Sequence, residues 1–110
     1  EEYAHKYGYS VVEMFCGHGL GRVFHDEPNV LHFGRKGTGP VIKEGMFFTI
    51  EPMINAGTNE IYEDEENGWT IYTEDDSMSA QFEHSLGVTK DGCEVFTYSP
   101  KGLDKPPYKK

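Results

Sequence analysis

Three side chains in this sequence occupy positions where a charged or metal-binding group is unusual. His18 lies within CGHGLG, directly after the apolar run SVVEMF, and its small neighbours allow a metal ion to approach closely. Glu51 lies inside TIEPM and Glu83 inside AQFEHS, each within a segment whose residue types predict a strand. Burying a carboxylate is costly unless it is paired, protonated or bound to a metal. His18, Glu51 and Glu83 therefore form a candidate set of metal ligands.

This ligand set restricts the class of metal. One imidazole nitrogen with several carboxylate oxygens suits manganese, iron(II), cobalt or zinc. A bridging carboxylate would allow two divalent ions about 3.5 to 4 Å apart, an arrangement that supports hydrolysis. The residues alone leave the identity of the metal open.

Other motifs are weaker. His25 follows His18 by seven residues, but the glycines between them disfavour a helix, so the two rings can converge only through a loop. GHGLGR lacks the third glycine of the dinucleotide fingerprint, and the sequence has neither a Walker loop nor a GxSxG turn. Cys16 is more simply a small buried residue than a nucleophile. Three further side chains, considered alone, would be ordinary core residues: Phe24, Met53 and Trp69.

The elements that must position these residues are short strands. We expect strands over residues 10–15, 46–56, 69–73, 80–89 and 93–98, the last entered through a turn at 90–92. Glycine-rich loops are expected over 17–30 and 31–45, and Pro52 marks an edge, bend or bulge. The first ten residues predict the end of a helix that runs into a strand. The pattern as a whole indicates a β-meander with little helix.

Residues 60–76 carry eight acidic side chains and no basic one, so nearly all of the negative charge is local. The first, third, fifth, sixth and twelfth positions of a calcium loop are approximated by Glu63, Glu65, Asn67, Gly68 and Glu74. That pattern requires the shorter aspartate at its first position and helices at its flanks, whereas the flanking residues here favour strands. We therefore predict a solvated hairpin with Asn67 and Gly68 at its turn.

Length, charge and cysteine content limit the number of domains, the kinds of partner and the cellular location that fit this sequence. At 110 residues and 36% hydrophobic residues, the chain fits one domain with a modest core. Its 19 acidic and 10 basic side chains give a formal charge of −9, which disfavours nucleic acid and anionic membranes as partners. No stretch is apolar over the length of a membrane span, and no leader is expected. Cys16 and Cys93 form no CxxC pair, which fits a reducing, cytoplasmic location.

Three linked motifs give the sequence a family resemblance. CGHGLGRVFHDEPNVLHF, KEGMFFTIEPMINAG and GWTIYTEDDSMSAQFEHSLGVTKDGCEVFT resemble, in order and with similar gaps, the C-terminal half of type I methionine aminopeptidases. Creatinases and proline aminopeptidases share the pita-bread fold but typically have Arg-x-Glu-Asp where this chain has QFEH, and type II enzymes differ in the first two motifs. The resemblance implies an α+β fold, the C-terminal half of a pita-bread domain, built mainly from a curved antiparallel β-sheet.

The resemblance also implies a role for each candidate residue. His18, Glu51 and Glu83 match ligands of two divalent ions, with Glu83 bridging them and Glu51 also assisting the attacking water. His25 matches a histidine that contacts the substrate near the scissile amide. The border of the methionine pocket is matched by Phe24, Met53, Trp69 and Gln81. The implied reaction is metal-assisted removal of the initiator methionine from nascent chains, as at the ribosome, when the second residue is small.

In that family, two aspartate ligands and another catalytic histidine come from an N-terminal half that this sequence lacks. We therefore expect half of one peptidase domain, ending in an extended tail over 99–110, which alone binds metal weakly and is inactive. Unpartnered strands would expose apolar surface, so self-association is expected. The alternative function is a non-catalytic pita-bread module that binds peptides or proteins. Retention of three charged ligands among apolar residues favours the enzyme.

Overall fold

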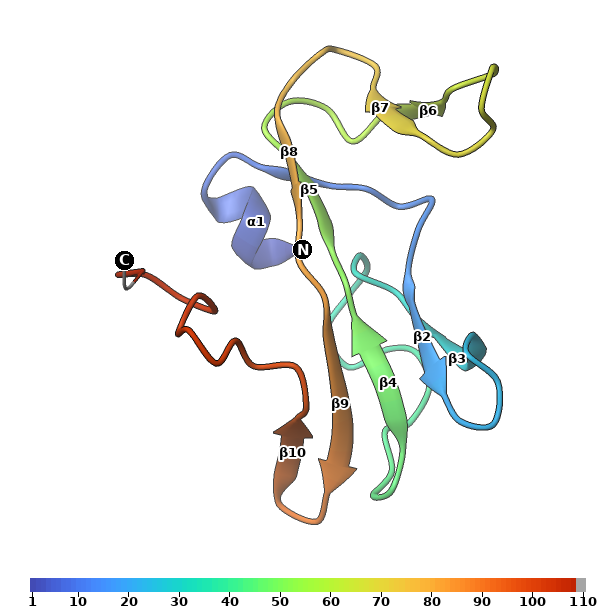
Figure 1. Ribbon diagram of the computed structural model, residues 1–110, viewed down its shortest axis with the longest axis vertical. Coiled ribbons are helices and arrows are strands. Elements are labelled where there is room, and N and C mark those ends of the chain that lie inside the picture. The colour runs from blue at the N-terminus through green and yellow to red at the C-terminus, as the bar shows by residue number, and fades with distance from the viewer. Residues whose placement is uncertain (109–110) are drawn as a thin grey trace.

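The computed structural model describes residues 1–108, and its strands dominate the fold (Figure 1). Within these residues the elements are, in chain order, α1 (Glu2–Lys6), β1 (Ser10–Val11), β2 (Gly17–Leu20), β3 (Asp26–Val30), β4 (Phe47–Ile50), β5 (Met53–Asn55), β6 (Ile61–Glu63), β7 (Ile71–Thr73), β8 (Ser79–Gln81), β9 (His84–Thr89) and β10 (Gly92–Val95). All strand pairs are antiparallel, in the orders β1-β5-β8, β10-β9-β4-β2-β3 and β6-β7. The predicted antiparallel, mainly β architecture is confirmed.

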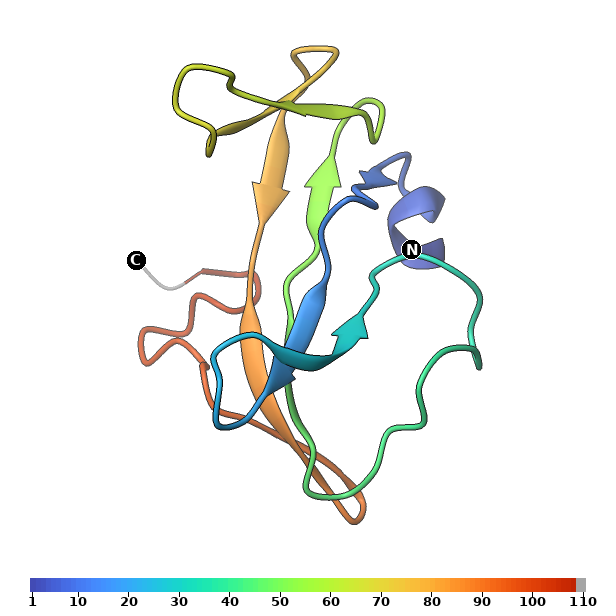
Figure 2. The ribbon, with the colours of Figure 1, turned by 90° about the vertical axis from the view of Figure 1, so that its right-hand side faces the viewer.

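Two chain segments pass from the larger sheet into the smaller one. In the larger sheet β4 pairs with β9, and Ile50 lies opposite His84; in the smaller sheet β5 pairs with β8, and Met53 lies opposite Gln81. The two breaks in strand pairing, at residues 51–52 and 82–83, therefore lie opposite each other on the two neighbouring segments. Figure 2 shows the two segments running side by side along the length of the molecule.

These breaks correct the expectation of single strands over 46–56 and 80–89. Pro52 has no N–H to give to a ladder, which ends the pairing of β4 with β9 at Ile50. Glu51 and Glu83 consequently lie between strands rather than inside them. The first expected strand is also shorter, because only Ser10 and Val11 pair with β5.

A loop is expected over the glycine-rich segment 17–30, but only residues 21–25 are irregular, and the prediction is wrong for the residues on either side, which form β2 and β3. β2 pairs with both β3 and β4, and β3 forms the edge of the larger sheet. A Cβ added at Gly17 would overlap the carbonyl oxygen of Thr49, and one at Gly19 would overlap that of Glu27. These glycines therefore permit close approach of neighbouring strands, which loop-forming propensity does not reveal.

The acidic hairpin, the turn between β9 and β10 and the irregular segment 31–45 are confirmed. In the hairpin, the Asp64 N–H donates to the Thr70 carbonyl at 2.8 Å, and Gly68 has a φ of 60°. The Asn67 side-chain oxygen accepts the N–H groups of Trp69 and Thr70, each at 2.9 Å. Backbone donors thus already use an oxygen that the calcium pattern would require.

The apolar core is small, as the composition predicts. The buried hydrophobic side chains among residues 1–108 are Val11, Val12, Phe48 and Leu86. Many large apolar side chains are exposed, including Trp69 at 84%. No helix in this part of the chain has the length and apolarity needed to cross a membrane.

The tail, expected to be extended over 99–110, contains turns and bends between residues 100 and 107. The carboxylate of Asp104 accepts the Ser99 N–H at 2.8 and 3.0 Å and lies 3.9 Å from Nε2 of His84. The tail therefore folds back towards β9. Residues 109–110 of the expected tail lie outside the described residues.

Asp75 ties together the two loops that flank the β6-β7 hairpin. Its carboxylate accepts the Thr58 N–H at 2.8 Å and the Ser77 N–H at 3.1 Å. Hydrogen bonds from the Ser77 side chain and from these backbone groups lower the pKa of Asp75 from 3.8 to about 2. Because ionised Asp75 is favoured in the folded state, its stabilising effect is present above pH 3.8 and is lost as the pH falls through about 2.

We expect Asp75→Asn to lower the unfolding temperature at pH 7, and this difference from the wild type to shrink between pH 4 and pH 2. Thermal unfolding followed by circular dichroism at several pH values would measure it. Asp91→Asn, at the turn between β9 and β10, removes a carboxylate that makes none of these bonds and serves as the control. A difference for Asp75→Asn that stays constant with pH would contradict the assignment.

Candidate metal centre

His18 is fixed on β2 by two hydrogen bonds. Its backbone N–H donates to Oγ1 of Thr49 at 3.0 Å, and its ring Nδ1 lies 3.0 Å from the carbonyl oxygen of Gly19. Because a carbonyl oxygen only accepts, Nδ1 of the neutral ring carries the proton and Nε2 keeps its lone pair. Nε2 faces Glu51, 3.4 Å from Oε1. The nearly buried imidazole, 9% exposed, thus presents a nitrogen suited to bind a metal.

Thr49 connects His18 to the first carboxylate. Its hydroxyl accepts the His18 N–H and donates to Oε1 of Glu51 at 2.8 Å. Thr49 and Glu51 are two residues apart in extended backbone, so their side chains share one face. Thr49, a neighbour in the same chain segment, consequently holds the Glu51 carboxylate towards β2.

Glu83 completes the cluster from the opposite break. One donor atom from each of His18, Glu51 and Glu83 lies within 4.8 Å of the other two. The ion pairs found within residues 1–108 all involve histidine, so no Lys or Arg neutralises either carboxylate. Two carboxylates and one imidazole nitrogen at this separation fit a divalent cation, which would offset their repulsion. The predicted ligand residues are therefore brought together by the fold.

His25 and Phe24 lie beside this cluster, in the connection from β2 to β3. The His25 ring centroid is 4.5 Å from that of His18, and the Phe24 centroid is 5.6 Å from it. Phe24 is 73% exposed. The expected convergence of the two histidines through a connecting loop is thus observed, and it places His25 at the edge of the metal-ligand cluster.

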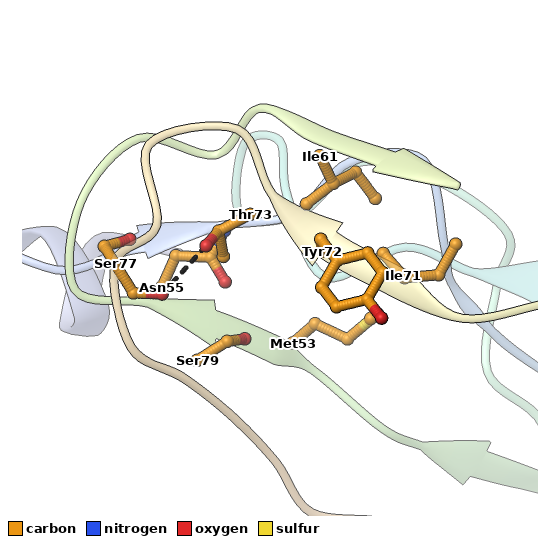
Figure 3. Close-up of a pocket in the computed structure, with 8 residues that line it drawn as sticks. All are labelled: Met53, Asn55, Ile61, Ile71, Tyr72, Thr73, Ser77 and Ser79. Carbon is orange, nitrogen blue, oxygen red and sulfur yellow. Dashed lines mark hydrogen bonds between the residues drawn. The ribbon is translucent and has the colours of Figure 1, made fainter. Parts of the chain in front are cut away.

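Of the three other residues predicted to border the substrate pocket, two lie close together and the third lies apart. Met53 and Gln81 lie opposite each other on β5 and β8. Met53 also lines a cavity of about 210 Å³, which Figure 3 shows with apolar side chains at one end and Thr73, Ser77 and Ser79 at the other. Trp69 is almost fully exposed on the hairpin and does not line this cavity.

Sequence reasoning missed three residues around the site. Thr49 could have been found from its two-residue spacing from Glu51. Asn55 is fully buried in the same cavity wall, and its Oδ1 has no hydrogen-bond partner among residues 1–108. Nε2 of His32 accepts a hydrogen bond from the Glu51 N–H at 3.0 Å. Burial lowers the pKa of His32 below 6.5, and this effect outweighs the nearby Glu51 carboxylate, which by itself would raise the pKa.

The antiparallel sheet brings an imidazole on β2 close to two carboxylates at paired strand breaks, and such a cluster is of the kind used by metal-dependent hydrolases. The chain belongs to metallopeptidase family M24, whose sequence pattern matches residues 1–90. The expectation that this chain is part of a metallopeptidase domain is thus confirmed.

Similar proteins agree with this assignment. A methionine aminopeptidase of Rickettsia prowazekii (strain Madrid E) is 61% identical over 108 residues, which is 98% of this chain and 42% of that protein. A methionine aminopeptidase of Escherichia coli (strain K12) is 56% identical over 90 residues, covering 82% of this chain and 34% of that protein. This chain therefore spans about two fifths or less of the length of these relatives.

Solved structures show the same fold. The crystal structure of methionine aminopeptidase from Rickettsia prowazekii superposes with a TM-score of 0.86 at 60% identity, covering 88% of this chain and 39% of that one. The methionine aminopeptidase structure from Thermotoga maritima gives a TM-score of 0.82 at 38% identity, covering 86% of this chain and 37% of that one. The predicted pita-bread fold is thus confirmed for the part of the domain that this chain represents.

Proposed function

We propose that this chain supplies part of the active site of a methionine aminopeptidase, and that the whole protein removes the N-terminal methionine of polypeptides whose second residue is small. The observation that carries the proposal is the convergence of His18, Glu51 and Glu83 from three separate segments in a chain of family M24. The high identity to proteins named methionine aminopeptidase supports the same choice. Nascent chains in the cytoplasm, as at the ribosome, are the proposed substrates.

Divalent ions would be held by Nε2 of His18 and the carboxylates of Glu51 and Glu83, and Glu83 would be the ligand that two such ions share. Cobalt, manganese, iron(II) and zinc all suit this donor set. Such ions, when bound, supply a Lewis acid for the scissile carbonyl and acidify water. The hydrogen bond from Thr49 to Oε1 of Glu51 orients the carboxylate and leaves Oε2 to take up a proton from the attacking water.

Residues near the cluster of His18, Glu51 and Glu83 are proposed to bind the substrate. We propose that His25, whose ring lies beside that of His18, donates a hydrogen bond to the peptide carbonyl and steadies the tetrahedral intermediate. Phe24 and Met53 offer aromatic and thioether surface for the methionine side chain. Gln81, opposite Met53, and Trp69, on the hairpin, are proposed to border this pocket.

We expect the 110-residue chain by itself to bind divalent metal weakly and to release no measurable methionine from a Met-Gly-x peptide. The resemblance implies that two further aspartate ligands come from the N-terminal half, so a pair of divalent ions would lack part of its ligands in this chain. Methionine release with Co²⁺ or Mn²⁺ added would be measured by chromatography, with the whole protein as the positive control. Turnover by the chain at the rate of the whole protein would refute the expectation.

The same assay separates the enzyme from a non-catalytic peptide-binding module. The enzyme predicts metal-dependent methionine release by the whole protein. A whole protein that binds Met-Gly-x peptides equally well with and without metal, and never cleaves them, would support the binding module instead.

A further inference from the structure

The peptide N–H of Glu51 makes a hydrogen bond that no strand supplies. Ile50 is the last residue of β4 that pairs with β9, and Pro52 has no N–H. Glu51 therefore carries the only backbone donor of this break. It donates to Nε2 of His32 at 3.0 Å, across nineteen positions of the chain. The half-buried His32 side chain, near the start of the irregular segment 31–45, thus accepts the hydrogen bond that a neighbouring strand would otherwise accept.

The surroundings of His32 place its ring beside the larger sheet. His32 lies two residues after the end of β3 and is half-buried. Together with Met46 and Phe48 it lines a hollow of about 590 Å³ between the segment 31–45 and the β3 and β4 strands. Phe48 is itself buried on β4, three residues before Glu51. His32 thus belongs to the irregular segment 31–45, but its imidazole lies beside β4, where it meets the Glu51 N–H.

We infer that His32 is a positioning residue for Glu51, holding its peptide unit so that the carboxylate points at His18 and Glu83. This inference rests on the proposed metal-binding function. Thr49 holds the carboxylate end of Glu51 at Oε1, and His32 holds the backbone end at the N–H. With both ends fixed, the residue has little freedom to turn away from the cluster although it lies in a break between strands.

His32 acts through Glu51 and is not itself a metal ligand. Its Nε2 lone pair is used by the Glu51 N–H, and in the neutral ring Nδ1 then carries the proton. The compact donor cluster accordingly contains His18, Glu51 and Glu83 without His32. Partners that orient metal ligands typically change metal affinity about 10- to 100-fold when they are removed.

The first test is the hydrogen bond itself. In the whole protein labelled with ¹⁵N, an N–H···N bond should produce a scalar coupling between the Glu51 amide nitrogen and Nε2 of His32. The coupling should be present before any metal is added. A well-resolved Glu51 amide signal without this coupling would overturn the inference, whatever metal the protein binds.

The second test compares His32→Gln and His32→Leu in the whole protein, with Co²⁺ as the probe. Gln keeps an acceptor for the Glu51 N–H, whereas Leu removes it. We expect His32→Leu to weaken Co²⁺ binding about 10-fold and to change the visible absorption of bound Co²⁺, and His32→Gln to stay within about 3-fold of the wild type. His5→Leu removes an exposed imidazole from α1 and is the matched control.

The outcomes separate this inference from the proposed function. A wild-type protein that fails to bind Co²⁺ would refute the proposed metal centre. A wild-type protein that binds Co²⁺, with His32→Leu unchanged in affinity and spectrum, would refute only the positioning role. Equal losses in folded His32→Gln and His32→Leu would also refute it, since the acceptor would then be irrelevant. If His32→Leu does not fold, the coupling and His32→Gln decide.

Discussion

Glu51→Gln is expected to lower kcat/KM of the whole protein on a Met-Gly-x peptide by about 10³-fold or more, which is about 4 kcal/mol of transition-state stabilisation. The amide has nearly the size of the carboxylate and can still accept the Thr49 hydroxyl, so the fold should be unchanged. It carries no negative charge for a divalent ion and no basic oxygen for a proton. One substitution therefore removes both proposed roles of Glu51.

Glu44→Gln provides the matched control for this loss, because Glu44 is exposed and lies outside the cluster, just before β4. It makes the same chemical change and should leave kcat/KM near the wild-type value. Metal content and the far-ultraviolet circular dichroism spectrum of both variants show whether the loss arises at the site. Wild-type activity in folded Glu51→Gln would contradict the assigned role and the proposed metal centre together.

The candidate cluster of His18, Glu51 and Glu83 could be predicted from the sequence because the residue types conflict with their surroundings. Glu51 and Glu83 are carboxylates among strand-forming apolar residues, and this conflict is visible without a structure. The strand breaks that hold them were less visible. Apolar residues continue on both sides of Pro52, and only the pairing of β4 with β9 and of β5 with β8 shows that the ladder stops and restarts.

The strand β2 could not be predicted from local propensity. GHGL has little intrinsic preference for a strand, and its extended form depends on pairing with β3 and β4. His32 was missed for a related reason. Its bond to Glu51 joins positions nineteen residues apart across an irregular connection, and no periodic pattern encodes such a contact. Tertiary packing, rather than the residue types, determines both features.

Gly17→Ala is expected to destabilise the chain by about 3 kcal/mol, the upper part of the usual range for overpacking. The added methyl group would overlap the carbonyl oxygen of Thr49, which is backbone and cannot rotate away as a side chain could. β2 would have to separate from β4 and break the bond from the His18 N–H to Thr49. Urea denaturation would measure the stability loss, and Co²⁺ binding by the whole protein should weaken as His18 moves.

Gly92→Ala tests whether this cost comes from close strand packing or from the loss of a glycine as such. Gly92 begins β10, and a Cβ there would meet no atom within 4 Å. Alanine at this position should leave the free energy of unfolding unchanged or raise it by up to about 1 kcal/mol, since glycine weakens a strand. Equal losses in both variants would mean that β2 does not need its glycine for contact with β4. A loss confined to Gly17→Ala would tie the glycine next to His18 to the placement of the imidazole proposed to bind metal.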